Sequence, residues 1–147
     1  MKAYSISEIA ALMNIAPSAI RFYDKEGLLP NVEKVNGRRV FREKDFAWLK
    51  VLNCLKTTGM PIREIRRYVE LAEKGDETLE ERFSIILKQK ENILSQIDTL
   101  NKQLKVIEYK EWFYRTSIDA GTEKIHENDP HTLNLEPDTI PKEKMEE

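Results

Sequence analysis

Three polar side chains recur at helical spacing between residues 16 and 29. Ser18, Arg21 and Lys25 are three and four positions apart, which places them on one face of a helix. A helix that exposes hydroxyl and guanidinium groups in this way can bind the edges of DNA bases. The spacing therefore makes Ser18 and Arg21 candidate DNA contacts.

Further basic side chains follow this segment. Arg38 and Arg39 come directly after Asn36-Gly37. Since adjacent strand residues face opposite ways, we expect one arginine to point towards phosphate and the other to pack back. The alternative is a solvated turn. Later helices add an outer row that contacts the sugar-phosphate backbone or is solvated surface charge: Lys56, Arg63, Arg66 and Arg67.

The single cysteine, Cys54, offers a nucleophile but no internal disulfide. Lys50 lies one helical turn before it, and Arg66 or Arg67 is expected to approach from the next helix. Positive charge near a thiol favours the thiolate, which is the reactive form. The alternative is that Cys54 is a small buried apolar residue. Residue chemistry leaves both interpretations open.

The two histidines, His126 and His131, lie near the C-terminus. Together with Glu127 and Asp129 they resemble a metal-ligand set, but the irregular spacing is typical of chance composition. We therefore expect no metal site and no cofactor. No histidine precedes residue 126, so Cys54 lacks the nearby base that a catalytic thiol needs, and the sequence does not favour an enzyme.

The candidate contacts sit on elements with clear boundary signals. Ser5 followed by Glu8 is a helix-capping pattern, and the helix it starts is joined by a short turn to one that begins at Pro17 and ends at Gly27. This predicts a helix-turn-helix over residues 5–28. Asn-Gly between short β-prone segments predicts a hairpin wing over residues 31–42.

Two more helices complete the predicted head, residues 1–75. They run from Glu43 to Thr58 and from Pro61 to Lys74, each closed by a glycine. We interpret residues 43–74 as a second, helical wing. Residues 1–74 hold 14 Lys and Arg against 9 Asp and Glu, which is compatible with a nucleic-acid partner on this side of the chain.

A long helix is predicted over residues 78–117. Its seam steps by four and three residues and is apolar except at Lys90 and Glu111. Since one small domain cannot cover such a stripe, we expect a second copy of the chain to do so, giving a two-fold dimer. The alternative is a helix that folds back on its own domain. The predicted dimerisation residues are Leu79, Phe83, Ile86, Ile93, Ile97, Leu100, Leu104, Ile107 and Tyr114.

The ends of the chain carry less information. Residues 120–147 are acidic and interrupted by prolines, which predicts a flexible tail. The N-terminus does not resemble a secretory leader, and no apolar run is long enough to cross a bilayer. We therefore expect a cytoplasmic protein without a membrane partner.

Taken in order, these motifs resemble the MerR family of bacterial transcription regulators over residues 4 to about 120. The matching segments are residues 4–10, residues 20–30, Gly37-Arg38-Arg39-Val40-Phe41 and residues 55–65. The resemblance implies a mainly α fold: a winged helix-turn-helix head followed by an antiparallel coiled-coil dimerisation helix. It also implies that the dimer binds a near-palindromic promoter operator and activates by bending and untwisting it, so that RNA polymerase engages the promoter.

The resemblance also suggests residue roles. Ser18 and Arg21 match base-edge contacts, and Phe22 stands where some relatives have a tyrosine, so one phosphate-binding hydroxyl is missing. Cys54 resembles the single-cysteine NmlR/AdhR-like branch, which is associated with aldehydes, other electrophiles and nitrosative stress. The implied phosphate contacts are Tyr4, Tyr23, Arg38 or Arg39, and Lys56.

Two other interpretations stay open. One is a regulator of the same type that senses another effector or none, with Cys54 as a structural residue. The other is a coiled-coil interaction module whose head binds protein, which leaves the Ser18 and Arg21 face and the arginine-bearing hairpin unexplained.

Overall fold

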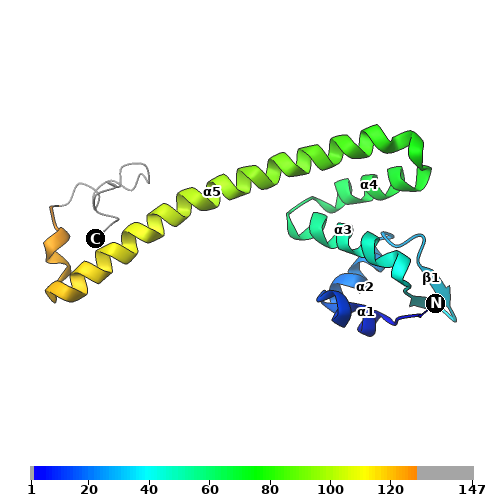
Figure 1. The fold of residues 1–147 in the computed structure, drawn as a ribbon, viewed down its shortest axis with the longest axis horizontal. Coiled ribbons are helices and arrows are strands. Elements are labelled where there is room, and N and C mark those ends of the chain that lie inside the picture. Colours follow the sequence, from blue (N-terminus) through cyan, green and yellow to red (C-terminus); the bar gives the residue numbers. More distant parts are fainter. Residues whose placement is uncertain (1, 129–147) are drawn as a thin grey trace. The chain divides into compact units, whose positions relative to one another are not determined.

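The structure is a computed structural model that describes residues 2–128. It is mainly helical, with a single two-stranded hairpin in that part of the chain (Figure 1). The described residues divide into two compact units between Lys90 and Glu91. None of the helices described combines the length and apolar character needed to cross a bilayer. The elements are α1 (Ile6–Met13), α2 (Pro17–Lys25), β1 (Glu33–Val35), β2 (Arg38–Val40), α3 (Phe46–Thr57), α4 (Ile62–Lys74) and α5 (Leu79–Ala120).

Helices α1 and α2 form the predicted helix-turn-helix. The Ser5 side chain accepts from the Glu8 N–H at 3.2 Å and donates to its carboxylate, so the capping pattern is confirmed. Pro17 occupies the first turn of α2. Gly27 follows the helix with φ of +74°, a conformation that glycine adopts without steric cost. These local signals fix the ends of α2.

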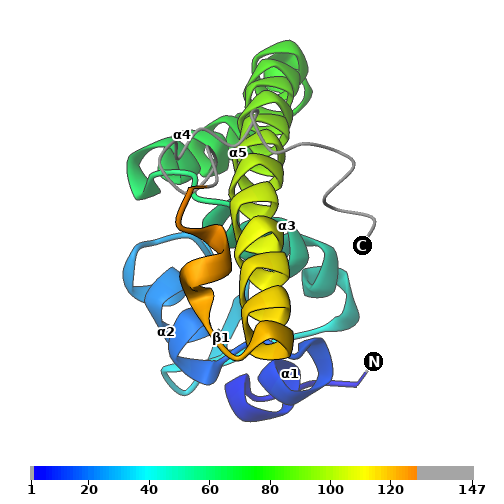
Figure 2. The same ribbon diagram turned by 90° about the vertical axis from the view of Figure 1, so that its left-hand side faces the viewer.

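The core of the head lies between α3 and its neighbours. In both views α3 is situated between the α1–α2 pair and α4 (Figures 1 and 2). Fully buried side chains come from all of these helices, and Ile9, Ile20, Leu49, Leu52 and Ile65 are at most 1% exposed. Burial of such large aliphatic groups fixes the orientation of α2 against α3.

The hairpin wing forms as predicted. Strands β1 and β2 pair antiparallel with Val35 opposite Arg38, and Asn36 and Gly37 both have positive φ, at 51° and 78°. Positive φ at both turn residues suits the right-handed twist of a two-residue hairpin. A bridge between Tyr4 and Phe41 ties the base of the wing to the N-terminal segment. The helix expected from residue 43 starts instead with a 3₁₀ turn over Glu43–Asp45.

The first part of α5 belongs to the head. Thr78 donates to the Leu71 carbonyl at 2.6 Å and accepts from Arg82 at 3.0 Å, which fixes the corner between α4 and α5. Ile85 packs against the core, and Gln89 is buried. This row faces the head, while the neighbouring apolar row does not.

The predicted apolar seam of α5 is exposed on the single chain. Ile93 is half-buried, and the other eight predicted dimerisation residues are exposed. Three further large apolar side chains are exposed on the same helix, namely Leu87, Leu94 and Ile118. The apolar stripe is therefore wider and longer than the predicted seam, and we refer to these eleven exposed residues as the α5 stripe.

Residues 122–127 differ from the flexible tail that composition predicted. A 3₁₀ turn, η3, spans Glu123–His126, and Thr122 caps it by accepting from the Lys124 N–H. His126 is buried, with its ring 4.4 Å from that of Phe113 and 4.8 Å from that of Trp112. Aromatic burial stabilises the turn although its sequence is polar. The remainder of the predicted tail, from residue 129, lies outside the described residues.

Candidate nucleic-acid interface

Helix α2 presents a polar face to solvent. Ser18, Arg21 and Lys25 are exposed, whereas Ile20 and Tyr23 on the opposite side are at most 1% exposed. This is the division of faces that the spacing predicted. Because the apolar side is fixed in the core, the exposed hydroxyl and guanidinium groups sit on a rigid support, as base readout requires.

The two wing arginines have different environments. Arg38 is exposed, whereas Arg39 is directed back into the head, where its guanidinium donates to Asp24 Oδ1 at 2.9 Å and to the Val32 carbonyl at 2.6 Å. The strand alternation thus assigns the outward position to Arg38. Arg39 already has two partners within the head, so it connects the wing to α2.

The two tyrosines expected at phosphates are both buried. Tyr23 is 1% exposed, and its hydroxyl donates to Asn53 Oδ1 at 3.2 Å. Burial also raises the pKa of Tyr23 above its ordinary value, since the phenolate would be poorly solvated. The Tyr4 ring packs against Phe46, with centroids 5.5 Å apart. The hydroxyl of Tyr23 is thus directed to Asn53 within the head, whereas the resemblance implied a phosphate contact for it.

Lys56 is held beside α2 by an aromatic ring. Its ammonium nitrogen lies 4.1 Å from the centroid of Phe22 and 5.6 Å from that of Tyr23. Both distances fall within the range of cation–π attraction. Phe22, which lacks a phenolic hydroxyl, therefore brings a cation to the same region. The missing hydroxyl is evident from the sequence, whereas this contact joins residues 34 positions apart and could not be predicted from it.

The arginines of α4 pair with carboxylates. Arg66 forms an ion pair with Glu26, which follows α2, and Arg67 lies 3.7 Å from Glu81 of α5. One of the two was expected to approach Cys54, and in the structure both guanidinium groups are engaged with these carboxylates. Arg63 is exposed.

Cys54 is exposed on α3, which contradicts the interpretation that it is a buried apolar residue. Its carbonyl accepts from the Thr58 hydroxyl at 2.7 Å, and that hydroxyl accepts from Gln89 Nε2 at 2.7 Å. A chain of hydrogen bonds therefore leads from the last turn of α3 to α5. The contact of Gln89 was not predicted, and its position outside the seam repeat gave no signal for it.

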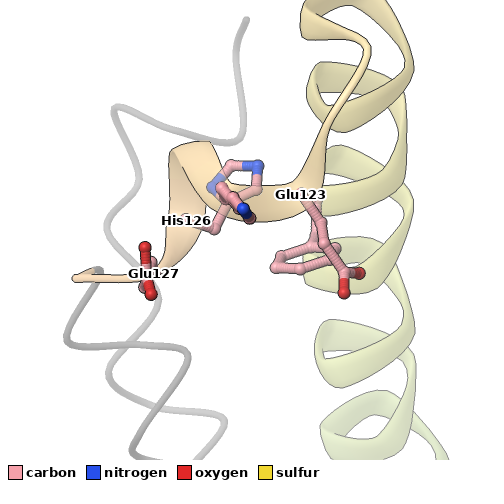
Figure 3. Close-up of a pocket in the computed structure, with 5 residues that line it drawn as sticks. Glu123, His126 and Glu127 are labelled. Atoms are coloured by element: carbon pink, nitrogen blue, oxygen red, sulfur yellow. The ribbon is translucent and has the colours of Figure 1, made fainter.

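Of the four residues weighed as metal ligands from the sequence, the structure describes His126 and Glu127. The Glu123 and Glu127 side chains lie on opposite sides of His126 (Figure 3), and His126 Nε2 is 2.6 Å from Thr116 Oγ1. Over residues 2–128 no three His, Cys, Asp or Glu side chains converge as ligands. Asp129 and His131, the other two residues considered as metal ligands from the sequence, lie outside the described residues.

A family model gives an independent comparison. The model described as "MerR HTH family regulatory protein" matches residues 4–72, which include α1, α2, the wing, α3 and most of α4. All the candidate contacts named above fall within this match.

Individual relatives extend the likeness into α5. An uncharacterized HTH-type transcriptional regulator of Haemophilus influenzae is 43% identical over 122 residues, which is 82% of this chain and 90% of that protein. The regulator AdhR of Bacillus subtilis is 28% identical, over 61% of this chain and 65% of that protein.

Two solved structures are similar to most of the chain. The crystal structure of HiNmlR, a MerR family regulator lacking the sensor domain, bound to promoter DNA, superposes with a TM-score of 0.78 at 42% identity. The alignment covers 84% of this chain and 95% of that one. A MerR family transcriptional regulator from Bacillus thuringiensis gives 0.68 at 35% identity, over 74% and 96% of the two chains.

Proposed function

Since the chain belongs to the MerR family of helix-turn-helix regulators, we propose that it binds a near-palindromic promoter operator as a homodimer and activates transcription by distorting the DNA. The protein is a DNA-binding transcription regulator of the MerR type. The observation that carries the proposal is the exposed face of α2 with Ser18 and Arg21, flanked by Arg38 on the wing and Lys56 on α3. In this proposal α2 is the recognition helix.

The α5 stripe supports the homodimer. A row of exposed isoleucine, leucine and phenylalanine side chains continues along one helix of 42 residues. Burying this row against a second copy removes several hundred square ångströms or more of apolar surface from water. Each square ångström of apolar surface buried stabilises the dimer by about 25 cal/mol. A two-fold dimer presents two identical recognition helices, which explains a near-palindromic operator.

The placement of the candidate contacts supports activation by distortion. Bases are read by α2, while the wing and α3 contribute exposed cations on either side of it. Two such heads joined by one dimer interface hold two half-sites at a fixed separation, so a change in the joint between head and α5 changes the DNA between them. In this proposal RNA polymerase is the partner that engages the distorted promoter.

The test of DNA binding is a salt series with a duplex that the purified protein selects from a random-sequence pool. Affinity is expected to fall about a thousandfold between ~50 and ~200 mM salt, as for proteins that neutralise about six phosphates. Fluorescence anisotropy measures the affinities. A response that is flat with salt, or failure to select any sequence, would favour the coiled-coil interaction module instead.

The sensing role proposed for Cys54 has three supports. Its thiol is exposed, its carbonyl is linked through Thr58 to Gln89 of α5, and AdhR is among the relatives. Addition of the thiol to an aldehyde such as formaldehyde forms a C–S bond, and the thiol proton ends on the new hydroxyl group. The added group perturbs the last turn of α3, and the hydrogen-bond chain carries the change to α5.

Replacing Cys54 with serine should abolish induction by formaldehyde, methylglyoxal or a nitrosothiol in a promoter reporter, because serine does not form the thiol adduct at neutral pH. Operator affinity without inducer should change less than about twofold, since Cys54 is not placed among the DNA contacts. Reporter output and anisotropy measure the two quantities. Full induction of Cys54→Ser would leave a regulator of the same family that uses another effector or none.

A further inference from the structure

Two carboxylates lie at the C-terminal end of the recognition helix, where the head is otherwise basic. Asp24 is in the last turn of α2, and Glu26 is its C-cap residue. Negative charge beside a DNA-binding surface repels phosphate and lowers affinity for any sequence. Two carboxylates in this position therefore need another role.

Each carboxylate binds an arginine from a different element. Asp24 Oδ1 accepts from Arg39 Nε of β2 at 2.9 Å, and Glu26 pairs with Arg66 of α4. One end of α2 is thereby connected to the hairpin wing and to the helical wing. These are the elements that flank the recognition helix in the proposed DNA complex.

The Asp24–Arg39 pair is the stronger connection. The Arg39 side chain is 15% exposed and that of Asp24 is 31% exposed, whereas the Glu26 and Arg66 side chains are 20% and 48% exposed. Arg39 also donates to the Val32 carbonyl at 2.6 Å, so its planar group is fixed by two partners. Charge-assisted bonds that are partly shielded from water hold geometry better than exposed pairs.

We propose that Asp24 and Glu26 are positioning residues that keep both wings in register with the recognition helix, raising sequence specificity at the expense of general attraction to DNA. This inference rests on the proposed function. Neither residue contacts DNA in the proposal. Asp24 acts through Arg39, and Glu26 acts through Arg66.

The test compares two variants that remove charges of opposite sign, Asp24→Asn and Arg39→Gln. If the two charges act only on DNA phosphate, Asp24→Asn raises affinity, Arg39→Gln lowers it, and the double variant returns near the wild-type value. If they act as a positioning pair, all three proteins lose affinity for the selected duplex by about tenfold, and the double variant loses no more than either single one. Affinity for a scrambled duplex of equal length should be unchanged or higher for Asp24→Asn.

The matched control is Glu70→Gln, which removes one exposed negative charge from α4 and leaves both pairs intact. Its ratio of selected to scrambled affinity should equal that of the wild type. All proteins are compared below their thermal unfolding midpoints. If Asp24→Asn does not fold, Glu26→Gln at the more exposed pair replaces it in the same comparison. The expected loss of affinity for the selected duplex is then smaller.

Higher affinity of Asp24→Asn for the selected duplex would overturn the positioning role, and so would an unchanged ratio of selected to scrambled affinity. The proposed function would remain, because the wild type would still prefer the selected duplex to the scrambled one. A wild-type protein that binds both duplexes equally would instead sink the proposed function. The ratio thus separates the two failures, and a fall in the ratio for both single variants supports the inference.

Discussion

Replacing Ile97 or Leu100 of α5 with glutamate is expected to convert the dimer into monomers and to lower operator affinity by about a hundredfold or more. Both side chains are exposed members of the α5 stripe. At a dimer interface each glutamate would be a buried charge without a partner, and two-fold symmetry doubles the cost. Analytical ultracentrifugation measures the first effect, and anisotropy with the selected duplex measures the second.

The loss in affinity has a separate physical origin from the loss in association. A monomer binds one half-site, whereas in a dimer the second head binds at a high effective concentration set by the linkage between the heads. Breaking the interface therefore removes most of the operator affinity without changing Ser18, Arg21 or any other candidate contact. The salt dependence that remains should be about half as steep, because half as many phosphates are neutralised.

Ser95→Glu is the matched control for these substitutions. Ser95 is exposed on α5 and lies on the side opposite the stripe by helical spacing. The same charge placed there should leave both the dimer and the affinity unchanged. Monomers with full operator affinity in Ile97→Glu would contradict a dimer as the DNA-binding unit. An undisturbed dimer would show that the α5 stripe is not the interface.

Much of the head could be predicted because its boundaries rest on local signals. Pro17 and Gly27 bound the recognition helix, and Asn36-Gly37 specifies the hairpin turn through the backbone conformations these residues allow. Helical spacing alone then assigned Ile20 to the core and Arg21 to solvent. Such features involve residues that are close in sequence, so one chain is enough to reveal them.

The contacts between elements could not be predicted in the same way. Glu26 and Arg66 are 40 positions apart, and nothing in the spacing of either helix indicates that they pair. Arg38 and Arg39 are equivalent by type, and the pairing of β2 with its neighbours decides which one points outward. Tyr23 is a plausible phosphate ligand by chemistry until the packing of α3 buries its hydroxyl. Tertiary packing determines which polar groups remain available.

The turn after α5 shows where amino-acid composition fails to predict order. Residues 122–127 are polar enough to predict disorder, yet one buried ring, that of His126, anchors the turn between Trp112 and Phe113. A single aromatic contact of this kind outweighs the average character of a short segment. Composition reports the mean tendency of a segment and misses such an anchor.

Removing Arg21 should have the largest effect of any single substitution in the recognition helix. Arg21→Ala is expected to lower affinity for the selected duplex by about thirtyfold or more, because a base contact of this type contributes about 1–3 kcal/mol and occurs once in each of the two half-sites. Affinity for a scrambled duplex should change much less. Anisotropy with both duplexes measures the difference.

Comparison with Lys56→Ala distinguishes base reading from phosphate binding. The ammonium of Lys56 is held over Phe22 beside the helix, as suits a phosphate contact. Its loss should weaken binding to both duplexes alike and make the salt dependence shallower by about one unit of slope per half-site. Arg21→Lys should restore only part of the loss in Arg21→Ala, because an ammonium keeps the charge but lacks the planar fork that aligns two parallel N–H groups with guanine O6 and N7. Full recovery with lysine would mean that Arg21 supplies only charge, so the sequence preference would have to come from Ser18 or from the shape of the DNA.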